Sequence, residues 1–356
     1  MSVGCSRFDR FASSSFKLRV NLTQIGGSRR TGPVSQRHDL LVIGEVNLDL
    51  IVSGAVVPAF GQQEQLVERA DLVLGGSGAI TACGAARLGL SVAFCGLAGG
   101  DLAGRIAVDQ IAAAGIDISA IAVVSGERSG IGVGLVREDG DRAILTYPGL
   151  IPRLAASDIP DESIERARHV HIGAYFLQTG LHAGLGDRLQ QHRRRGGTVS
   201  LDPNWDPSGR WDLSGLLGAV DLLLPNDREA CLLARCDDVE EAALRLAAHG
   251  CAVAVKVGAA GALWCADGHL LHVPVEGIGA IVEATGAGDS FNAGVIAGLL
   301  DGLPQAEFLR LGNACGALSL RGVGGTATQP TREEVFQFRQ ELARAEGHVD
   351  SVRRTA

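Results

Sequence analysis

The segment Glu283-Ala-Thr-Gly-Ala-Gly-Asp-Ser-Phe-Asn292 leads into a predicted helix that continues as AGVIAGLL to Leu300. Its small residues let the backbone curl so that the N–H groups of Gly286, Ala287 and Gly288 point at one spot, and the helix adds its positive N-terminal end. The pattern predicts an anion hole. Asp289 follows it directly and can accept the proton of an attacking hydroxyl while the amides hold a transferring phosphoryl group. The alternative reading of Asp289 is a carboxylate that only stabilises the helix dipole.

The rest of the chain alternates between strand and helix patterns, which predicts an α/β fold with a mostly parallel sheet. The apolar run DLLVIGEVNLDLIV begins at Asp39 and predicts the first core strand, and alternation resumes at Arg168. Polar residues should therefore gather at the carboxyl ends of the strands. Further predicted elements are strands over 91–99, 169–175, 198–204, 221–226 and 252–258, and helices over 78–88, 101–114, 181–195, 227–248, 287–300, 305–320 and 332–345.

Two stretches break this alternation and predict a small separate sheet. Residues 50–74 and 129–147 are strand-like without an intervening helix, and the second turns at Glu138-Asp139-Gly140 as a hairpin does. Arg142 and Tyr147 in this hairpin are candidates for contact with a second phosphate or an acidic group of a substrate. An arginine in a hairpin is more often simply solvated, by about three to one.

Composition excludes several classes of protein. The 356 residues carry a formal net charge of −8 with a pI near 5.6, which disfavours a nucleic-acid partner. No run of 18 apolar residues is present to span a membrane. The eight cysteines form no C-x-x-C pair, so we expect reduced thiols in a cytoplasmic protein. Residues 1–37 are predicted to be a disordered tail or to follow a misplaced start, with a transit peptide as the alternative, and 347–356 to be a C-terminal tail around a domain at 38–346.

Thr285-Gly-Ala-Gly-Asp-Ser-Phe291 resembles the second signature of the ribokinase-type (PfkB) carbohydrate kinases, and the segment from Gly75 to Gly89 resembles the first. Further segments follow in the order of that family, and the resemblance runs from about Asp39 to Glu334. These segments are GEVNLDLI at 44–51, GxxGxDxxG at 96–104, DPNW at 202–205, PNDREA at 225–230 and KVGAAGA at 256–262. The resemblance implies a three-layer α/β/α sandwich with a small β-sheet lid, and an ATP-dependent kinase acting on a hydroxyl of a sugar.

The resemblance also implies roles for individual residues. Gly286, Ala287 and Gly288 would form the anion hole and Asp289 would be the base. The nucleotide side, with ATP and Mg²⁺ as cofactors, would involve Glu229, which holds Mg²⁺ through water, together with Asn226, Lys256, Gly258, Gly261 and Asn313. The sugar side would comprise Asn47, Asp49, Gly75, Gly76, Ser77 and Gly78. The lid would close over the sugar and join two copies into a homodimer.

The sequence departs from the family pattern at two positions. Ile80 stands where the first signature usually has Asn, so either the polarity of the substrate or the support of the loop differs. Glu283 stands where the second signature usually has Asp, a ligand of an activating monovalent cation such as K⁺. Glu283 and Thr285 are therefore candidates either to coordinate that cation or to fill its site.

Two alternatives to a sugar kinase remain open at this point. A nucleoside kinase of the same family would need a pocket that stacks a base, and aromatic residues are only 4% of the chain. A non-catalytic sensor of sugar or nucleotide would fit the changes at Ile80 and Glu283, but it would have no chemical need for Asp289.

Overall fold

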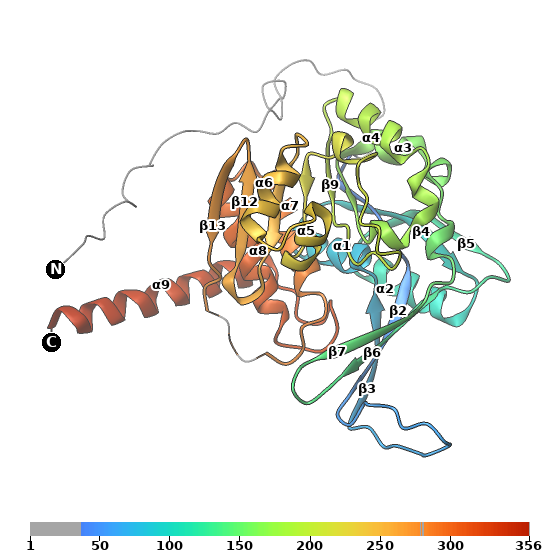
Figure 1. The fold of residues 1–356 in the computed structure, drawn as a ribbon, viewed down its shortest axis with the longest axis horizontal. Coiled ribbons are helices and arrows are strands. Elements are labelled where there is room, and N and C mark those ends of the chain that lie inside the picture. Colours follow the sequence, from blue (N-terminus) through green and yellow to red (C-terminus); the bar gives the residue numbers. More distant parts are fainter. Residues whose placement is uncertain (1–36, 278, 280, 356) are drawn as a thin grey trace. The chain divides into compact units, whose positions relative to one another are not determined.

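The computed structural model describes residues 37–277, 279 and 281–355, and its main element is a nine-stranded sheet (Figure 1). The strands run in the order β13-β12-β11-β10-β9-β8-β1-β4-β5. Neighbours from β11 to β5 are parallel, and β12 and β13 are added antiparallel at one edge. The bounds are β1 His38–Ile43, β4 Val92–Gly99, β5 Asp117–Val124, β8 Ala167–Ile172, β9 Thr198–Leu201, β10 Leu222–Leu223, β11 Ala252–Lys256, β12 Ala262–Ala266 and β13 His269–Val273.

Helices cover both faces of this sheet, so the core has two halves. Strand β1 shows the division, because Leu41 and Ile43 pack into one half while Leu40 and Val42 pack into the other. One half is covered by α3 (Asp161–Arg166), α4 (Leu185–Arg194), α5 (Asp227–Ala234) and α6 (Val239–Ala247). The other is covered by α1 (Ser77–Arg87), α2 (Leu102–Ala113), α7 (Ala287–Leu300), α8 (Gln305–Ser319) and α9 (Arg332–Thr355). The predicted three-layer α/β/α sandwich is confirmed.

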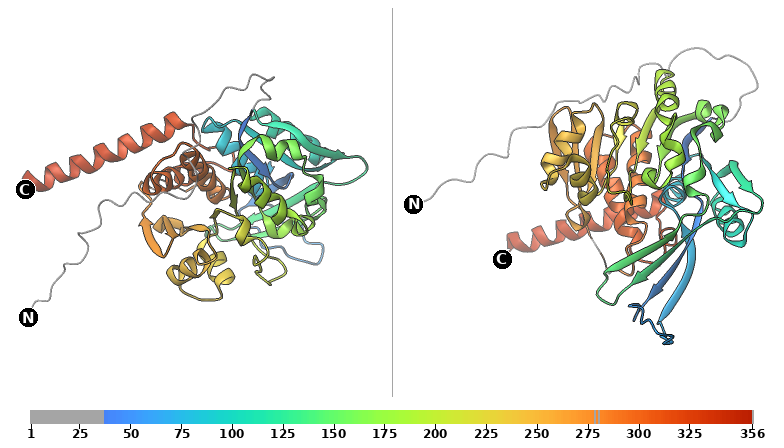
Figure 2. Two further views of the ribbon diagram at one scale, coloured as in Figure 1. Left: turned by 90° about the horizontal axis from the view of Figure 1, so that it is seen from above. Right: turned by 45° about the vertical axis from the view of Figure 1, so that its right-hand side comes forward.

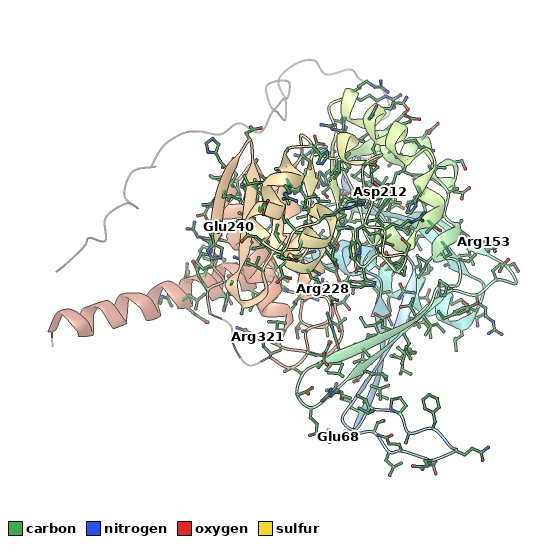
Figure 3. All side chains as sticks on the ribbon, in the orientation of Figure 1. Glu68, Arg153, Asp212, Arg228, Glu240 and Arg321 are labelled. Atoms are coloured by element: carbon green, nitrogen blue, oxygen red, sulfur yellow. The ribbon has the colours of Figure 1, made fainter. Side chains whose placement is uncertain are left out.

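A second, four-stranded sheet confirms the expectation of a separate small sheet. Its order is β3-β2-β6-β7, from β2 (Asn47–Ser53), β3 (Arg69–Gly75), β6 (Gly130–Val136) and β7 (Arg142–Tyr147). Two further views show these strands extending away from the main sheet (Figure 2). The loop over residues 54–68 carries almost fully exposed Phe60 and Leu66, and Figure 3, where Glu68 is labelled, shows its side chains projecting outward.

Register gives the small sheet two distinct faces. Asp49 lies opposite both Val73 and Gly132, and Gly132 lies opposite Thr146, so these side chains share one face with Arg142 and Ile144. We call this the inner face, because Asp49 belongs to it. The outer face carries the alternate residues, among which Ile131, Leu72, Leu145 and Tyr147 are exposed by 37%, 54%, 62% and 52%.

Several predicted elements have different bounds in the structure. The helix expected over 227–248 is two helices, since Arg235 adopts a left-handed conformation with φ 54° and the Asp238 side chain caps α6 by accepting from the Glu241 amide. Strands β5, β12 and β13 were not predicted. Helix α9 continues ten residues past Ala345, into the predicted C-terminal tail, and the predicted tail at 1–37 lies outside the described residues apart from Arg37.

The expectations for cysteine and for membranes can be compared with the described part of the chain. All cysteines described there are free thiols, and most are buried. Within the same residues, no helix is both long and apolar enough to cross a membrane.

Candidate active site

The carboxyl edge of the main sheet brings together polar side chains from four strand ends. Glu45 follows β1, Asp202 follows β9, Asn226 follows β10 and Lys256 ends β11. Because these strands are parallel, all four residues come to the same edge. The N-terminus of α7 reaches this edge from a distant part of the sequence.

Asp289, in the first turn of α7, is hydrogen bonded across the chain to the start of α1. The Ser77 hydroxyl donates to Asp289 Oδ1 at 2.6 Å, and the Ser77 amide donates to Glu45 Oε1 at 2.7 Å. The three side chains form a short row from β1 to α7. Gly286 caps α7 with φ 77°, and a Cβ at this position would lie 2.4 Å from Gly325 Cα, so only glycine allows this tight loop.

The electrostatics of this row suit a proton acceptor. The pKa of Asp289 is raised to about 7, chiefly by burial and next by the nearby Asp202 carboxylate, while the Ser77 hydrogen bond and the charges of Lys256 and Arg142 oppose the rise. Burial likewise raises the pKa of Glu45 to about 7. A carboxylate with a pKa near 7 is well matched to act as a general base at neutral pH.

Lys256 forms a buried ion pair beside Asp289. Its Nζ lies 2.7 Å from Asp202 Oδ2, and the Asn292 Nδ2 donates to the same oxygen at 2.5 Å. The nearest atoms to a Cβ placed on Gly288 would belong to Lys256, with Nζ at 3.7 Å. The Lys256 ammonium group therefore lies close to the Gly288 backbone, and an ammonium group beside loop amides is an arrangement that suits an anion.

Asn226 and Glu229 form a capping box at the start of α5. The Asn226 Oδ1 accepts from the Glu229 amide at 2.8 Å, and Glu229 Oε2 accepts from the Asn226 amide at 2.9 Å. Glu229 is buried, with a pKa raised to about 7 first by burial and then by Asp202, whereas Lys256 lowers it. Glu229 is therefore not an ordinary exposed carboxylate of a helix, since only 5% of it is exposed.

Of the remaining residues predicted for the nucleotide, Gly261 and Asn313 contact the protein's own backbone at the end of β13. A Cβ on Gly261, at φ 100°, would lie 2.3 Å from the Val273 carbonyl oxygen, whereas one on Gly258, at φ 57°, would meet open space. The close approach at Gly261 is thus made to β13. Asn313 on α8 donates from Nδ2 to the carbonyls of Val273 at 2.9 Å and Pro274 at 3.2 Å, and so fixes the end of the same strand.

The residues predicted for the sugar come together at the base of the small sheet. The Asn47 Nδ2 donates to Asp49 Oδ1 at 2.9 Å. A Cβ on Gly75 or on Gly132 would lie 2.3 Å from Asp49 Oδ1, and one on Gly76 would lie 2.8 Å from Asn47 Oδ1. Burial raises the pKa of Asp49 to about 6, and the Glu283 charge adds to the rise.

Glu283 fastens the anion-hole loop to the segment that follows α8. Its Oε1 accepts from the Thr285 amide at 2.6 Å and its Oε2 from the Gly324 amide at 3.0 Å. Both carboxylate oxygens therefore have backbone partners.

Ile80 supports the same loop from the other side. A Cβ on Gly325 would lie 2.5 Å from Ile80 Cδ1, and Gly325 in turn packs against Gly286. Of the two readings of this departure, altered support of the loop is the one that the packing favours.

Three residues of the site were not singled out as site residues from the sequence. Glu45 and Asp202 lie within the quoted segments GEVNLDLI and DPNW, and Asn292 ends the quoted segment from Glu283. Glu45 and Asp202 stand in polar runs directly after apolar strands, and this signal in the sequence would have found them.

His169 and His171 are buried and share the Ser200 hydroxyl at 2.7 Å and 2.8 Å. No group of three or more His, Cys, Asp or Glu side chains within the described residues could hold a metal.

Comparison with known proteins gives the family. The model of the pfkB family carbohydrate kinases matches residues 37–332. The chain belongs to this family. An uncharacterized sugar kinase of Archaeoglobus fulgidus is 32% identical over 254 residues, which are 69% of this chain and 98% of that protein.

Two further relatives agree with this assignment. A 2-dehydro-3-deoxygluconokinase of Bacillus subtilis is 29% identical, over 74% of this chain and 86% of that protein. A ribokinase of Thermotoga maritima has the same fold, with a TM-score of 0.71 at 25% identity, over 85% of this chain and 99% of that one. The fold is ribokinase-like, and PfkB members are phosphotransferases with an alcohol group as acceptor.

Proposed function

We propose that this PfkB-family kinase transfers the γ-phosphoryl group of ATP to a hydroxyl of a sugar or sugar-like substrate, with Asp289 as general base. The observation that carries the proposal is the hydrogen bond from Ser77 to Asp289 at the mouth of the Gly286–Gly288 loop. It supports the proposal because Ser77 belongs to the residues proposed for the sugar, while Asp289, whose pKa is about 7, directly follows the amides proposed for the phosphate.

Each residue has one part in the proposed reaction. Asp49 accepts hydrogen bonds from sugar hydroxyls, and the Asn47 amide can both donate to them and accept from them. Together the two side chains orient the acceptor. Asp289 accepts the proton of the reacting hydroxyl as its oxygen approaches phosphorus. The amides of Gly286, Ala287 and Gly288 stabilise the charge on the phosphoryl oxygens. Lys256 is held in place by Asp202 beside that position.

The residues present fit a nucleotide and Mg²⁺. The Gly288 backbone beside the Lys256 ammonium group suits a phosphate, and Glu229 keeps Oε1 free of the capping box for a metal-bound water. When bound, Mg²⁺ would neutralise charge on the phosphates. A candidate ribokinase II of Escherichia coli was solved with ATP and Mg²⁺, which supports the same cofactors here; it has a TM-score of 0.74 at 25% identity over 85% of this chain and 99% of that one.

The acceptor site supports a sugar rather than a nucleoside. Asp49 is in contact with the Asn47 side chain and lies against Gly75 and Gly132, none of which can stack a base. A relative named as a 2-dehydro-3-deoxygluconokinase supports a sugar acid among the candidates. A cytoplasmic location fits the free thiols of the described cysteines.

Transfer to a panel of acceptors tests this function. Purified protein with Mg²⁺ and ATP is offered neutral sugars, sugar acids and nucleosides, and the phosphorylated product is detected directly. We expect one sugar or sugar acid to stimulate ADP release. The sensor alternative is favoured instead if nothing is phosphorylated while a sugar still raises the melting temperature.

We propose that Glu283 fills the predicted monovalent-cation site instead of coordinating K⁺. The ground is that both of its carboxylate oxygens already accept backbone hydrogen bonds from Thr285 and Gly324. We therefore expect the same turnover in potassium, sodium and a bulky organic cation at equal ionic strength. A gain specific to potassium would show that Glu283 and Thr285 coordinate the ion after all.

We also propose that two copies pair through the outer faces of their small sheets. The support is the group of exposed apolar side chains there, which includes Leu145 and Tyr147. Leu145→Asp should convert a dimer into a monomer in light scattering. Ile144→Asp is the matched control, because Ile144 is equally exposed, at 62%, but lies on the inner face. A wild-type protein that is monomeric at all concentrations would contradict the pairing.

A further inference from the structure

Arg142 brings a positive charge from the small sheet to the phosphoryl-transfer position. It is the first residue of β7, opposite Val136, and register puts it on the inner face together with Asp49. Its Nη1 donates to Thr285 Oγ1 at 3.3 Å, although the two residues are 143 positions apart in the chain. Thr285 directly precedes the Gly286–Gly288 loop.

The surroundings of Arg142 leave its charge available to a ligand. Among the described residues its side chain has no carboxylate partner, and its hydrogen bond goes to a neutral hydroxyl. The other cation of the site, Lys256, is already paired with Asp202. The charge of Arg142 also lowers the pKa of Asp289, against the larger opposing effects of burial and of Asp202, which agrees with its closeness to the base.

The inner face between Asp49 and Arg142 is clear of side chains from β6. Gly130, Gly132 and Gly134 occupy its inward positions, so β6 contributes only backbone there. A Cβ on Gly132 would collide with Asp49, and one on Gly130 would lie 2.7 Å from Ile151 Cδ1. The inner face thus carries a carboxylate at Asp49 and a guanidinium at Arg142, with no β6 side chain at Gly134 between them.

We propose that Arg142 is a further catalytic residue, which contacts the γ-phosphoryl group of ATP while it is transferred. This inference rests on the proposed kinase function. A guanidinium presents a planar set of N–H donors that matches the oxygens of a phosphoryl group, and its charge persists at any working pH. The loop amides supply partial charges only, so Arg142 adds a full charge where the transition state is most anionic.

The transfer step balances with the groups named. The acceptor oxygen forms a bond to the γ-phosphorus as its proton passes to Asp289. The bond from that phosphorus to the bridging oxygen breaks, and ADP leaves with the electron pair. Arg142 forms hydrogen bonds to the phosphoryl oxygens throughout and gains or loses no proton. Because it belongs to the small sheet, its charge is in place only while that sheet lies against the α7 end of the site.

A competing role for Arg142 is recognition of an acid group on the acceptor. The contact with Thr285 argues for the phosphoryl group, because the part of an acceptor that reaches Asp289 is its reacting hydroxyl. The two roles differ in what a substitution changes, so the experiment below separates them.

Two substitutions and a matched control test the proposal. Arg142→Gln removes the positive charge. Arg142→Lys keeps the charge but loses the planar set of N–H donors. Arg137→Gln removes a charge from the same hairpin, where Arg137 is paired with Asp139. We expect Arg142→Gln to lower kcat about a hundred- to a thousandfold with KM for the acceptor little changed, as loss of a transition-state donor does. Arg142→Lys should recover part of this loss, and Arg137→Gln should resemble wild type.

Binding of ADP with Mg²⁺ and aluminium fluoride gives a readout that needs no acceptor. We expect Arg142→Gln to weaken this phosphoryl mimic at least about tenfold more than it weakens ADP alone. Equal weakening of both would overturn the proposal, whether or not the wild type phosphorylates any acceptor. A loss confined to acidic acceptors and expressed in KM would also overturn it and assign Arg142 to substrate recognition. Failure of the wild type on the acceptor panel would count against the kinase function itself.

Discussion

Asp289→Asn should lower kcat at least about a hundredfold with the best acceptor, because the variant cannot accept the proton of the attacking hydroxyl. The amide keeps an oxygen that can accept from Ser77, so the geometry of the row from Glu45 to α7 should persist. Initial-rate kinetics with direct detection of the phosphorylated product measure the effect.

The same substitution should stabilise the fold at alkaline pH. Asp289 has a pKa of about 7 in the folded chain against an ordinary value of 3.8, so the folded state binds more protons between these values. The free energy of unfolding therefore falls as the pH rises from about 4 to 7, and the loss is complete above pH 7. Asn cannot ionise and escapes this loss. Urea unfolding at pH 4 and pH 8 should show the variant gaining relative to wild type only at pH 8.

The control for Asp289→Asn is the same change at Asp109, an exposed residue of α2. Asp109→Asn should leave both turnover and stability unchanged. A fully active Asp289→Asn would remove the base from the mechanism, and an inactive variant that is less stable at both pH values would point to a structural role instead.

Asp202→Ala should have the largest effect on stability. It leaves the Lys256 ammonium buried without its partner and takes away the acceptor of the Asn292 amide, and loss of one member of a buried pair costs about 3–5 kcal/mol. The free energy of unfolding from urea titration measures the loss. Lys256 is 14% exposed at its side chain and Asp202 is 5% exposed, so water compensates little.

Two further variants separate the buried charge from loss of packing. Adding Lys256→Met to Asp202→Ala should recover most of the stability, because no unpaired charge remains. Glu241→Ala breaks the exposed pair with Arg245 on α6 and should cost well under about 1 kcal/mol. A double variant no more stable than Asp202→Ala would show that packing around Asp202, and not the charge of Lys256, determines the loss.

Local sequence was sufficient for the α/β class and for the motif from Glu283 to Asn292. Apolar runs followed by polar residues predict parallel strands with polar residues at their carboxyl ends, and the structure confirms that arrangement at β1, β9 and β11. The small residues before Asp289 predict the loop, because only glycine allows the φ of Gly286. Both inferences depend on interactions within a few residues. Strands β12 and β13 escaped prediction because antiparallel pairing at an edge leaves no helix between them.

The family, the proposed base Asp289 and the small sheet could all be predicted from the amino-acid sequence. Which distant side chains meet depends on how the chain packs, as it does for Ser77 with Asp289, Lys256 with Asp202, and Arg142 with Thr285. The numbers of residues between these partners follow no regular repeat, so no sequence pattern could reveal the contacts. The crossover connections of the sheet bring the partners together, and local propensity does not. The contacts of Glu283 also depend on the packed fold, because no motif predicts that its two carboxylate oxygens accept from the amides of Thr285 and Gly324. Hydrogen bonds and ion pairs of this kind depend on positions fixed to within an ångström, which only a packed core provides.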